Sequence, residues 1–212
     1  MDRYAETFET WNKVAKQYED KFMDLDLYNE TYAFFCASIP SENAHILDLG
    51  CGPGNITKYL LTNRPDFTIL GIDVAPQMVE LAKKNNPTAK FSVMDVRKIN
   101  KLKASFDGIV CGFCLPYLSE SDCREFIFNC SRLLHDHGII YLSFVEGDLD
   151  KSHFQVRSNG DRVYFYYHPI DQIKNLLTQH GFSELRAFQV EYQKGETELE
   201  IHTILTARKT TN

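Results

Sequence analysis

The chain has few of the features that nucleic-acid-binding and membrane proteins rely on. Its 23 Lys and Arg residues are outnumbered by 29 Asp and Glu residues, which gives a formal net charge of −6 and a pI near 5.6. Nucleic acids are bound by clustered basic side chains, whereas the longest local cluster here is Lys98, Lys101 and Lys103, between two expected elements. No apolar run approaches the roughly 20 residues that cross a bilayer. We therefore expect no nucleic-acid partner and no membrane partner.

We also expect no secretory leader, no disulfide and no metal site. The first residues, Met1-Asp2-Arg3-Tyr4-Ala5-Glu6, include no apolar run of signal-peptide length, so we expect a cytoplasmic protein. The six cysteines fall mostly within expected strands and helices, as is typical of reduced, partly buried thiols. Cys111 and Cys114 have the spacing of a redox or zinc pair, but no second such pair and no histidine pair accompanies them. We therefore expect no bound metal.

What the chain does contain is enough apolar side chains for a sizeable core. Apolar residues make up 43% and aromatic residues 13% of its 212 residues. This composition fits one α/β domain that spans residues 1–212. No repeat, low-complexity tract or linker divides the sequence.

One stretch organises the rest of the chain. Residues 46–49 are a short apolar run, and Gly50, Gly52 and Gly54 follow it in alternation. The run is typical of a buried parallel strand, and glycines let a backbone turn approach a ligand without an obstructing Cβ. The stretch therefore predicts a strand, loop and helix at a ligand-binding edge.

The N-terminal region precedes this edge and has an aromatic pattern. Phe8, Trp11, Ala15, Tyr18 and Phe22 recur at spacings of three and four, which places them on one helix face. A second helix is expected over residues 28–38. Packing onto the core explains such a face, but the polar groups of Trp11 and Tyr18 also suit these two rings to covering a ligand. We expect an N-terminal helical lid over residues 1–40.

Strands and helices alternate from residue 44 onward. Strands are expected at residues 46–49, 67–72, 91–94, 106–111 and 139–144, and helices at residues 55–63, 76–86 and 120–135. Strands separated by helices imply right-handed crossovers and a parallel sheet covered on both faces.

The last third of the chain has a different pattern. Asn159-Gly160 between strand-like runs predicts a hairpin, and a helix is expected over residues 170–180. Two final strands, at residues 184–192 and 198–208, are joined through Lys194-Gly195 and must pair antiparallel. The sequence therefore predicts a seven-stranded, mostly parallel sheet with one antiparallel strand and helices on both faces.

Acidic residues end three successive strands, where open α/β sheets bind their ligands. They are Asp48, Asp73 and Asp95. Asp73 lies 19 residues beyond Gly54, which suits a carboxylate that binds ribose hydroxyls, in NAD or in another nucleoside. Against NAD, Asn55 stands at the third glycine position of GxGxxG and Pro53 removes an amide donor. The carboxylate of Asp48 would also repel a diphosphate and attract an amine.

These residues resemble the class I S-adenosylmethionine-dependent methyltransferases, which have a Rossmann-like fold. The resemblance rests on Ile46-Leu47-Asp48-Leu49-Gly50-Cys51-Gly52-Pro53-Gly54, Gly71-Ile72-Asp73-Val74-Ala75-Pro76-Gln77-Met78, Phe91-Ser92-Val93-Met94-Asp95-Val96 and Phe106-Asp107-Gly108-Ile109-Val110-Cys111. Four motifs in order are more specific than any one alone. The resemblance implies a cofactor-binding half over residues 41–150 and a substrate-side half over residues 151–212.

The resemblance also implies roles for particular residues toward S-adenosyl-L-methionine. Asp48 would orient the methionine ammonium through the loop, Asp73 would bind both ribose hydroxyls and Asp95 would accept from the adenine amine. The remaining expected cofactor contacts are Tyr18, Gly50, Cys51, Gly52, Val74, Met78, the Val96 amide and the Cys111 carbonyl.

The methyl acceptor is expected to be a small molecule. Pro116-Tyr117 stands where many small-molecule members carry two histidines, and the Asn/Asp-Pro-Pro-aromatic pattern of nucleic-acid amine methylation is absent. If a base is needed, His168 and His153 are the candidates, with Phe113, Tyr117 and Tyr166 around the substrate. Two other functions stay open, an NAD-dependent oxidoreductase and a non-catalytic S-adenosylmethionine-binding module. The protein is expected to be a monomer or a homodimer.

Overall fold

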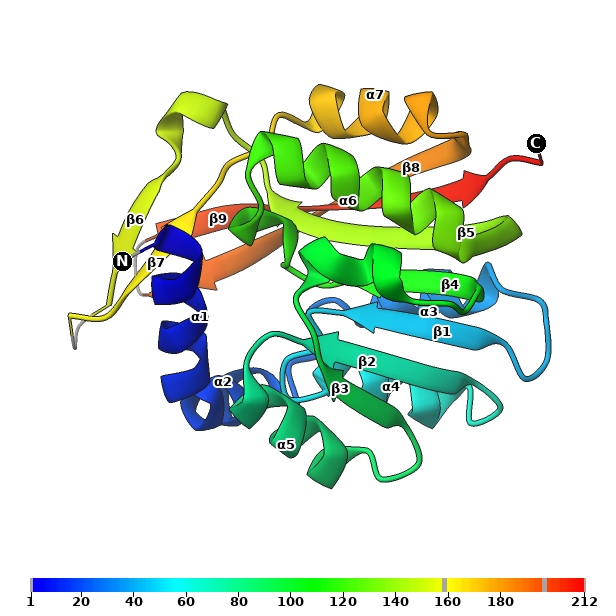
Figure 1. Ribbon diagram of the computed structural model, residues 1–212, viewed down its shortest axis with the longest axis horizontal. Coiled ribbons are helices and arrows are strands. Elements are labelled where there is room, and N and C mark those ends of the chain that lie inside the picture. Colours follow the sequence, from blue (N-terminus) through cyan, green and yellow to red (C-terminus); the bar gives the residue numbers. More distant parts are fainter. Residues whose placement is uncertain (1, 158–159, 196–197, 212) are drawn as a thin grey trace.

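A seven-stranded sheet forms the centre of the structure, a computed structural model that describes residues 2–157, 160–195 and 198–211. The strand order is β3-β2-β1-β4-β5-β9-β8 (Figure 1). Only β9 runs against its neighbours, and it pairs antiparallel with both β5 and β8. This arrangement confirms the predicted sheet. The strands are β1 (His45–Leu49), β2 (Thr68–Asp73), β3 (Lys90–Val93), β4 (Phe106–Cys111), β5 (Leu134–Val145), β8 (Phe182–Lys194) and β9 (Glu198–Lys209).

Helices cover both faces of this sheet. Side chains of α3 (Asn29–Ala37) and α4 (Asn55–Asn63) pack on one face, around Ile46, Val110 and Tyr141. Side chains of α6 (Glu120–Leu133) and α7 (Ile170–Gln179) pack on the other, around Leu47 and Ile109. Because successive side chains of a strand point to opposite faces, the apolar strands contribute to both clusters. The buried parallel strands are therefore apolar almost throughout.

The N-terminal region forms two helices where the sequence predicted one continuous aromatic face. Helix α1 (Arg3–Lys13) ends and α2 (Ala15–Phe22) begins at Val14, whose φ of −97° and ψ of 11° depart from helical geometry. Val14 and Ala15 are both buried. The bend allows α1 to pack against β7 (Arg162–Phe165) and α2 to pack against α5 (Pro76–Asn85), and this packing outweighs the local preference for one helix.

A separate antiparallel pair, β6 (His153–Val156) and β7, lies beside α1 (Figure 1). The pair agrees with the expected hairpin. Of the two expected turn residues, Asn159 lies outside the described residues, and Gly160 has a φ of +86°. Two threonines of α1 bind the backbone of β7: Thr10 Oγ1 donates to the Arg162 carbonyl at 2.8 Å, and the Tyr164 amide donates to Thr7 Oγ1 at 2.9 Å. These bonds attach the first helix to the hairpin.

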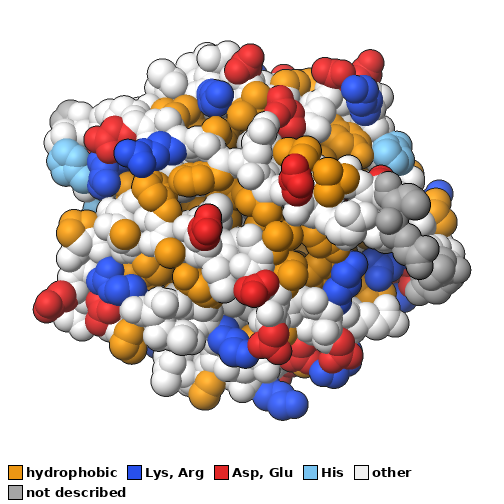
Figure 2. Space-filling view, turned by 180° about the vertical axis from the view of Figure 1, so that it is seen from behind, with side chains coloured by type: hydrophobic (Ala, Val, Ile, Leu, Met, Phe, Trp, Pro, Cys, Tyr) orange, Lys and Arg blue, Asp and Glu red, His pale blue; other side chains and the backbone are white. Residues whose placement is uncertain are grey.

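The surface carries charges of both signs. Figure 2 shows acidic and basic side chains interspersed with apolar ones over the face turned away from the viewer of Figure 1. Within the described ranges, no helix has the length and apolar character needed to cross a membrane.

Candidate functional site

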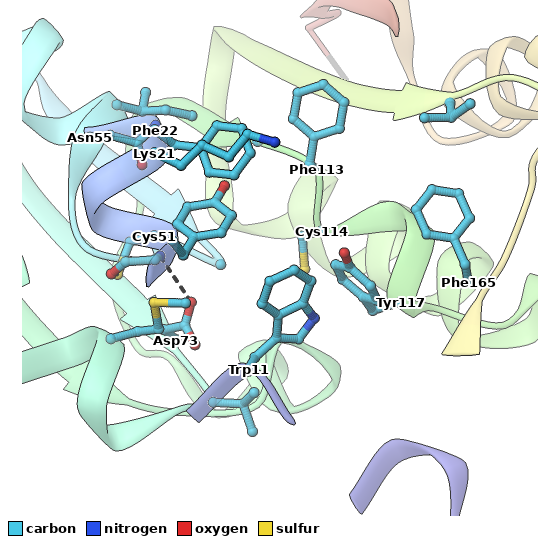
Figure 3. Close-up of a pocket in the computed structure, with 18 of the residues that line it drawn as sticks. Trp11, Lys21, Phe22, Cys51, Asn55, Asp73, Phe113, Cys114, Tyr117 and Phe165 are labelled. Carbon is cyan, nitrogen blue, oxygen red and sulfur yellow. Dashed lines mark hydrogen bonds between the residues drawn. The ribbon is translucent and has the colours of Figure 1, made fainter. Parts of the chain in front are cut away.

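A cavity of about 380 Å³ opens at the carboxyl ends of the parallel strands. The segments that follow β1, β2, β3 and β4 form one side of it, and α1 and α2 contribute Trp11, Tyr18 and Phe22 from the other. Figure 3 shows Trp11 beside Tyr117, with Cys51 and Asp73 across the cavity. The expected contacts Tyr18, Gly50, Cys51, Gly52, Asp73, Val74, Met78, Asp95, Val96, Phe113 and Tyr117 all line this cavity.

The glycine loop after β1 has the positive φ values that its sequence predicts. Gly50 and Gly52 have φ values of +70° and +52°, a region that side-chain-bearing residues rarely enter. The Gly50 and Cys51 amides each donate to the Ile72 carbonyl at 2.9 Å, which fixes the loop to β2. A Cβ on Gly50 would lie 3.0 Å from the Cys114 Cβ. The loop therefore has no room for a side chain at Gly50.

Asp73 stands at the end of β2 and lines the cavity. Its Oδ2 accepts from the Gly52 amide and its Oδ1 from the Ala75 amide, each at 2.9 Å. Burial raises the pKa of Asp73, and the backbone donors of Ala75, Gly52 and Val74 offset part of that rise. A carboxylate offers about four lone-pair positions, so this group is an acceptor that a ligand in the cavity can use.

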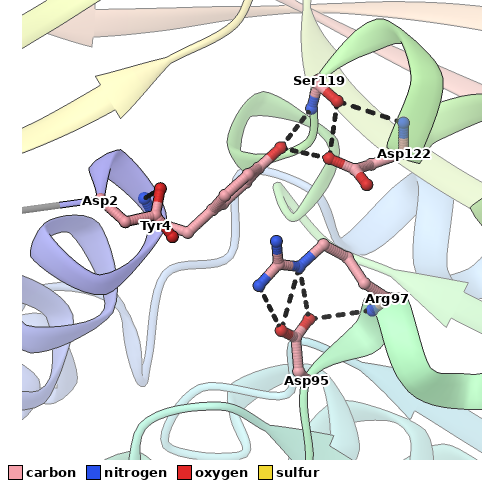
Figure 4. Close-up of polar contacts among 6 residues, drawn as sticks. All are labelled: Asp2, Tyr4, Asp95, Arg97, Ser119 and Asp122. Carbon is pink, nitrogen blue, oxygen red and sulfur yellow. Dashed lines mark hydrogen bonds and ion pairs between the residues drawn. The ribbon is translucent and has the colours of Figure 1, made fainter.

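Asp95 is already engaged with Arg97, which the sequence did not reveal (Figure 4). The Arg97 guanidinium binds both carboxylate oxygens, with its Nη2 2.6 Å from Oδ2 and its Nε 3.1 Å from Oδ1, and the Arg97 amide donates to Oδ1 at 2.9 Å. The guanidinium carbon also lies 3.9 Å from the centre of the Tyr4 ring. Asp95 lines the cavity, but a ligand amine would have to compete with Arg97 for its oxygens.

Asp48 lies behind the loop and does not line the cavity. It is fully buried, and its Oδ2 accepts from Thr57 Oγ1 at 2.7 Å. Its Oδ1 has no hydrogen-bond partner among the described residues. Burial raises its pKa to about 7, the Thr57 bond lowers it, and the charge of Asp73 raises it further. Any effect of Asp48 on a ligand must therefore pass through the loop.

Aromatic side chains close the cavity from the side of the N-terminal helices. The Trp11 ring meets Tyr18 and Tyr117 edge-on, with both centroid distances at 5.6 Å. The Trp11 Nε1 atom is buried without a hydrogen-bond partner in the described structure. Buried indole N–H groups normally have an acceptor, so this unpaired donor is an exception beside the cavity.

Four other expected site residues lie away from the lining. His168 is fully buried, its Nε2 is 3.1 Å from the Leu115 carbonyl, and burial lowers its pKa. His153 is exposed, with its Nδ1 2.7 Å from the Lys151 carbonyl. Tyr166 stacks on Tyr4, and the Cys111 side chain lies in the core. Neither histidine is placed to act as a base in this cavity.

The far wall of the cavity comes from β8 and β9, which the sequence reasoning missed. It includes Tyr192, Lys194, Glu200 and His202, together with Tyr28 from the start of α3. Tyr28 Oη is 2.7 Å from His202 Nδ1, and His202 Nε2 is 2.9 Å from Glu200 Oε2. The signal was present in the sequence, because an antiparallel final strand must bring its first residues to the carboxyl edge of the other strands.

Comparisons with known proteins agree with this geometry. Residues 46–138 match the family described as "Methyltransferase domain". The trans-aconitate 2-methyltransferase of Escherichia coli is 33% identical over 122 residues, which are 57% of this chain and 47% of that protein. The chain therefore matches about half the length of this curated relative.

Two solved structures share the fold over nearly the whole chain. Magnesium protoporphyrin IX methyltransferase from Synechocystis PCC 6803, solved with bound SAM, has a TM-score of 0.75 at 16% identity and covers 99% of this chain and 98% of its own. A Burkholderia thailandensis 1,6-didemethyltoxoflavin-N1-methyltransferase has a TM-score of 0.74 at 21% identity, and the match covers 98% of this chain and 88% of that protein. Together, these comparisons show that residues 46–138 are similar to a methyltransferase domain and that nearly the whole chain shares the fold of these two methyltransferase structures.

Proposed function

We propose that the protein transfers a methyl group from S-adenosylmethionine to a small-molecule acceptor. The observation that carries this proposal is the junction of the glycine loop with Asp73, beside a cavity covered by aromatic rings. Asp73 offers carboxylate oxygens at the cavity lining, and Gly52 presents backbone without a side chain. Carboxylates at this strand end bind ribose hydroxyls in nucleoside-binding sheets.

The residues present fit such a nucleoside. Val74 and Met78 offer apolar contact beside Asp73, and Trp11 Nε1 is a buried donor without a partner in the described structure. Asp48 places a carboxylate behind the loop, where its charge would favour a cationic amine. When bound, S-adenosylmethionine supplies a methyl group that its sulfonium sulfur already activates.

The chain's own contribution is alignment and exclusion of water. Asp73 holds the nucleoside end, and the loop at Gly50 and Gly52 lets a ligand lie against the backbone. Helices α1 and α2 act as a lid, because Trp11, Tyr18 and Phe22 cover the cavity opposite the strand ends. The acceptor side lies toward β8 and β9, where the polar residues of the cavity wall gather.

The similar proteins favour a small acceptor. One matched relative is named for trans-aconitate and two structural neighbours for magnesium protoporphyrin IX and 1,6-didemethyltoxoflavin. These are different chemical classes, so they support a small molecule without naming one. The cavity wall carries both cationic side chains, Lys21, Arg157 and Lys194, and acidic ones, Asp73, Asp95 and Glu200, so its charge does not select an anionic acceptor.

The test is transfer of labelled methyl from S-adenosylmethionine to a panel of phenols, amines and carboxylates. We expect label in at least one acceptor and S-adenosylhomocysteine as the second product. Tight binding of S-adenosylhomocysteine without transfer to any panel member would favour a non-catalytic binding module. Binding of NAD in place of S-adenosylhomocysteine would contradict the proposal and favour an oxidoreductase.

A further inference from the structure

Three polar side chains form a continuous chain of hydrogen bonds in the cavity wall. Tyr28 Oη lies 2.7 Å from His202 Nδ1, and His202 Nε2 lies 2.9 Å from Glu200 Oε2. Glu200 Oε1 is 3.4 Å from Lys194 Nζ. These three residues and Lys194 all line the cavity, and Tyr28 is the first residue of the chain of bonds. A tyrosine, a histidine and a carboxylate in this order can accept and hold a proton.

The reversed strand β9 is what brings this chain of bonds to the site. His202 pairs with Val145, the last residue of β5, and Glu200 pairs with Tyr192 of β8. Glu200 and His202 are two residues apart, so they point to the same face of the sheet. Tyr28 directly precedes α3 on that face, and its carbonyl accepts from the Tyr32 amide at 3.1 Å. Rigid elements therefore hold all three groups.

The His202 ring is also fixed in orientation. Tyr192 stacks on it with a centroid distance of 4.8 Å and an interplanar angle of 16°, and Phe113 meets it at 4.6 Å. Phe113 directly follows β4 and lines the cavity. The ring thus lies between the β8 wall and the loop after β4. A histidine held in this way keeps one nitrogen toward each of its two partners.

The charges of the neighbours determine which nitrogen carries the proton. Hydrogen bonding from His202 and the charge of Lys194 lower the pKa of Glu200, so its carboxylate is ionised at neutral pH. An ionised carboxylate only accepts hydrogen bonds, so His202 donates to it from Nε2, and the relay uses the tautomer that carries its single ring proton there. Its Nδ1 is then unprotonated and accepts from the Tyr28 hydroxyl. The arrangement leaves a basic nitrogen behind a hydroxyl that faces the cavity.

We propose that Tyr28, His202 and Glu200 form a proton relay that deprotonates the methyl acceptor. This inference rests on the proposed methyltransferase function. The acceptor's O–H or N–H bond breaks, and its proton moves to Tyr28 Oη as the Tyr28 proton moves to His202 Nδ1. The electron pair freed on the acceptor atom forms the bond to the methyl carbon. The electron pair of the carbon–sulfur bond stays on sulfur, and His202 becomes an imidazolium beside Glu200.

Tyr28 touches the acceptor in this scheme, while His202 and Glu200 are positioning residues that act through it. Burial raises the pKa of Tyr28 well above its ordinary value, so Tyr28 passes on one proton as it takes another and no free phenolate forms. The relay has a use only when the acceptor carries a proton at neutral pH. The acceptor class is therefore a hydroxyl, a phenol or an amine, and a carboxylate, already ionised, gains nothing from the relay.

Two substitutions test the relay, each with a matched control outside the cavity. Tyr28→Phe removes the hydroxyl and His202→Gln removes the basic nitrogen, and Tyr59→Phe and His180→Gln make the same chemical changes elsewhere. We expect both relay variants to bind S-adenosylhomocysteine within about twofold of wild type. We expect methyl transfer to a neutral phenol or amine of the panel to fall about 10²–10⁴-fold, the range for loss of a general base. Both controls should keep the wild-type rate.

A second readout does not depend on turnover. Nitrogen-15 NMR of wild type with bound S-adenosylhomocysteine should show His202 as the neutral tautomer protonated at Nε2, and Tyr28→Phe should change the Nδ1 resonance. A proton on Nδ1 at neutral pH would overturn the relay, as would Tyr28→Phe turnover equal to that of Tyr59→Phe. If wild type fails to bind S-adenosylhomocysteine, the proposed function itself is contradicted. Normal binding with Nδ1 protonated contradicts the relay alone.

Discussion

Two carboxylates near the glycine loop, Asp48 and Asp73, have opposite surroundings. Asp73 lines the cavity and accepts from the Gly52 and Ala75 amides. Asp48 is fully buried, and one of its oxygens has no partner within the described structure. The same residue type therefore stands at the cavity lining at one position and is a buried, titrating group behind the loop at the other.

Substitution of Asp73 should weaken cofactor binding. Asp73→Ala removes the acceptor of the ribose hydroxyls and leaves the Gly52 and Ala75 amides without their partner. We expect the binding free energy of S-adenosylhomocysteine to fall by roughly 1–3 kcal/mol, the scale of lost charged hydrogen bonds. Calorimetric titration measures the change. Asp24→Ala, at an exposed residue paired with Lys58, is the control, and an affinity for Asp73→Ala equal to that control would contradict the ribose assignment.

The buried Asp48 should make stability depend on pH. Its pKa is about 7 in the folded protein against an ordinary value of 3.8. The contribution of Asp48 to the free energy of unfolding is fully present below about pH 4 and is lost as the pH rises through 7. The reason is that the folded state keeps the Asp48 proton up to a higher pH than the unfolded state does. Asp48→Asn should remove this loss, so its free energy of unfolding at pH 8 should exceed that of wild type by up to a few kcal/mol. Each unit between the two pKa values corresponds to about 1.4 kcal/mol.

Chemical denaturation of the unliganded protein at pH 4, 6 and 8 measures this difference. The free energy of unfolding of Asp48→Asn relative to wild type should rise from pH 4 to pH 8. A difference that stays constant across the three pH values would show that Asp48 has the same pKa in the folded and unfolded states, and would contradict the raised pKa.

At the scale of elements, the bend at Val14 gives the N-terminal helices two separate anchors. Helix α1 is bound to β7 through Thr7 and Thr10, while α2 packs on α5 with Tyr18 toward the cavity. The N-terminal end of α1 is held by Tyr4, which bonds to Asp122 and stacks on Arg97 (Figure 4). The two helices are thus held by separate parts of the molecule while Trp11 and Tyr18 face the cavity, so ligand binding can be tested for an effect on each helix.

Hydrogen exchange can test whether these helices close over the cofactor. We expect S-adenosylhomocysteine to slow amide exchange across α1 and α2, because bound ligand would add contacts to Trp11 and Tyr18. Helix α7, which packs on the sheet away from the cavity lining, should exchange at the same rate with and without ligand. Equal protection of α1 and α2 in both states would exclude the lid.

For the whole molecule, the sequence was sufficient to predict those parts of the fold and of the cavity whose local residue pattern agrees with their position in the folded chain. The alternating strands and helices predicted the sheet, and Asp73 and the glycine loop predicted one side of the cavity. Side chains brought together by long-range pairing were not predictable in the same way. The Arg97 contact of Asp95 and the Tyr28–His202 bond depend on how loops and β9 pack, and the buried position of His168 depends on segments with little pattern.

The whole-molecule consequence of ligand binding is a rise in melting temperature, because a ligand that binds only the folded state stabilises it. At a ligand concentration 100 times the Kd the gain is about 2.7 kcal/mol. For a domain of this size that gain corresponds to a shift of roughly 5–10 °C. The stabilisation should depend on Asp73 if this residue binds the nucleoside as proposed.

Thermal unfolding with S-adenosylhomocysteine or NAD tests the central claim most directly. We expect S-adenosylhomocysteine to raise the Tm of wild type, Asp73→Ala to lose most of this rise, and NAD to leave the Tm unchanged. A rise with NAD and none with S-adenosylhomocysteine would contradict the assignment of this cavity to a methyl donor.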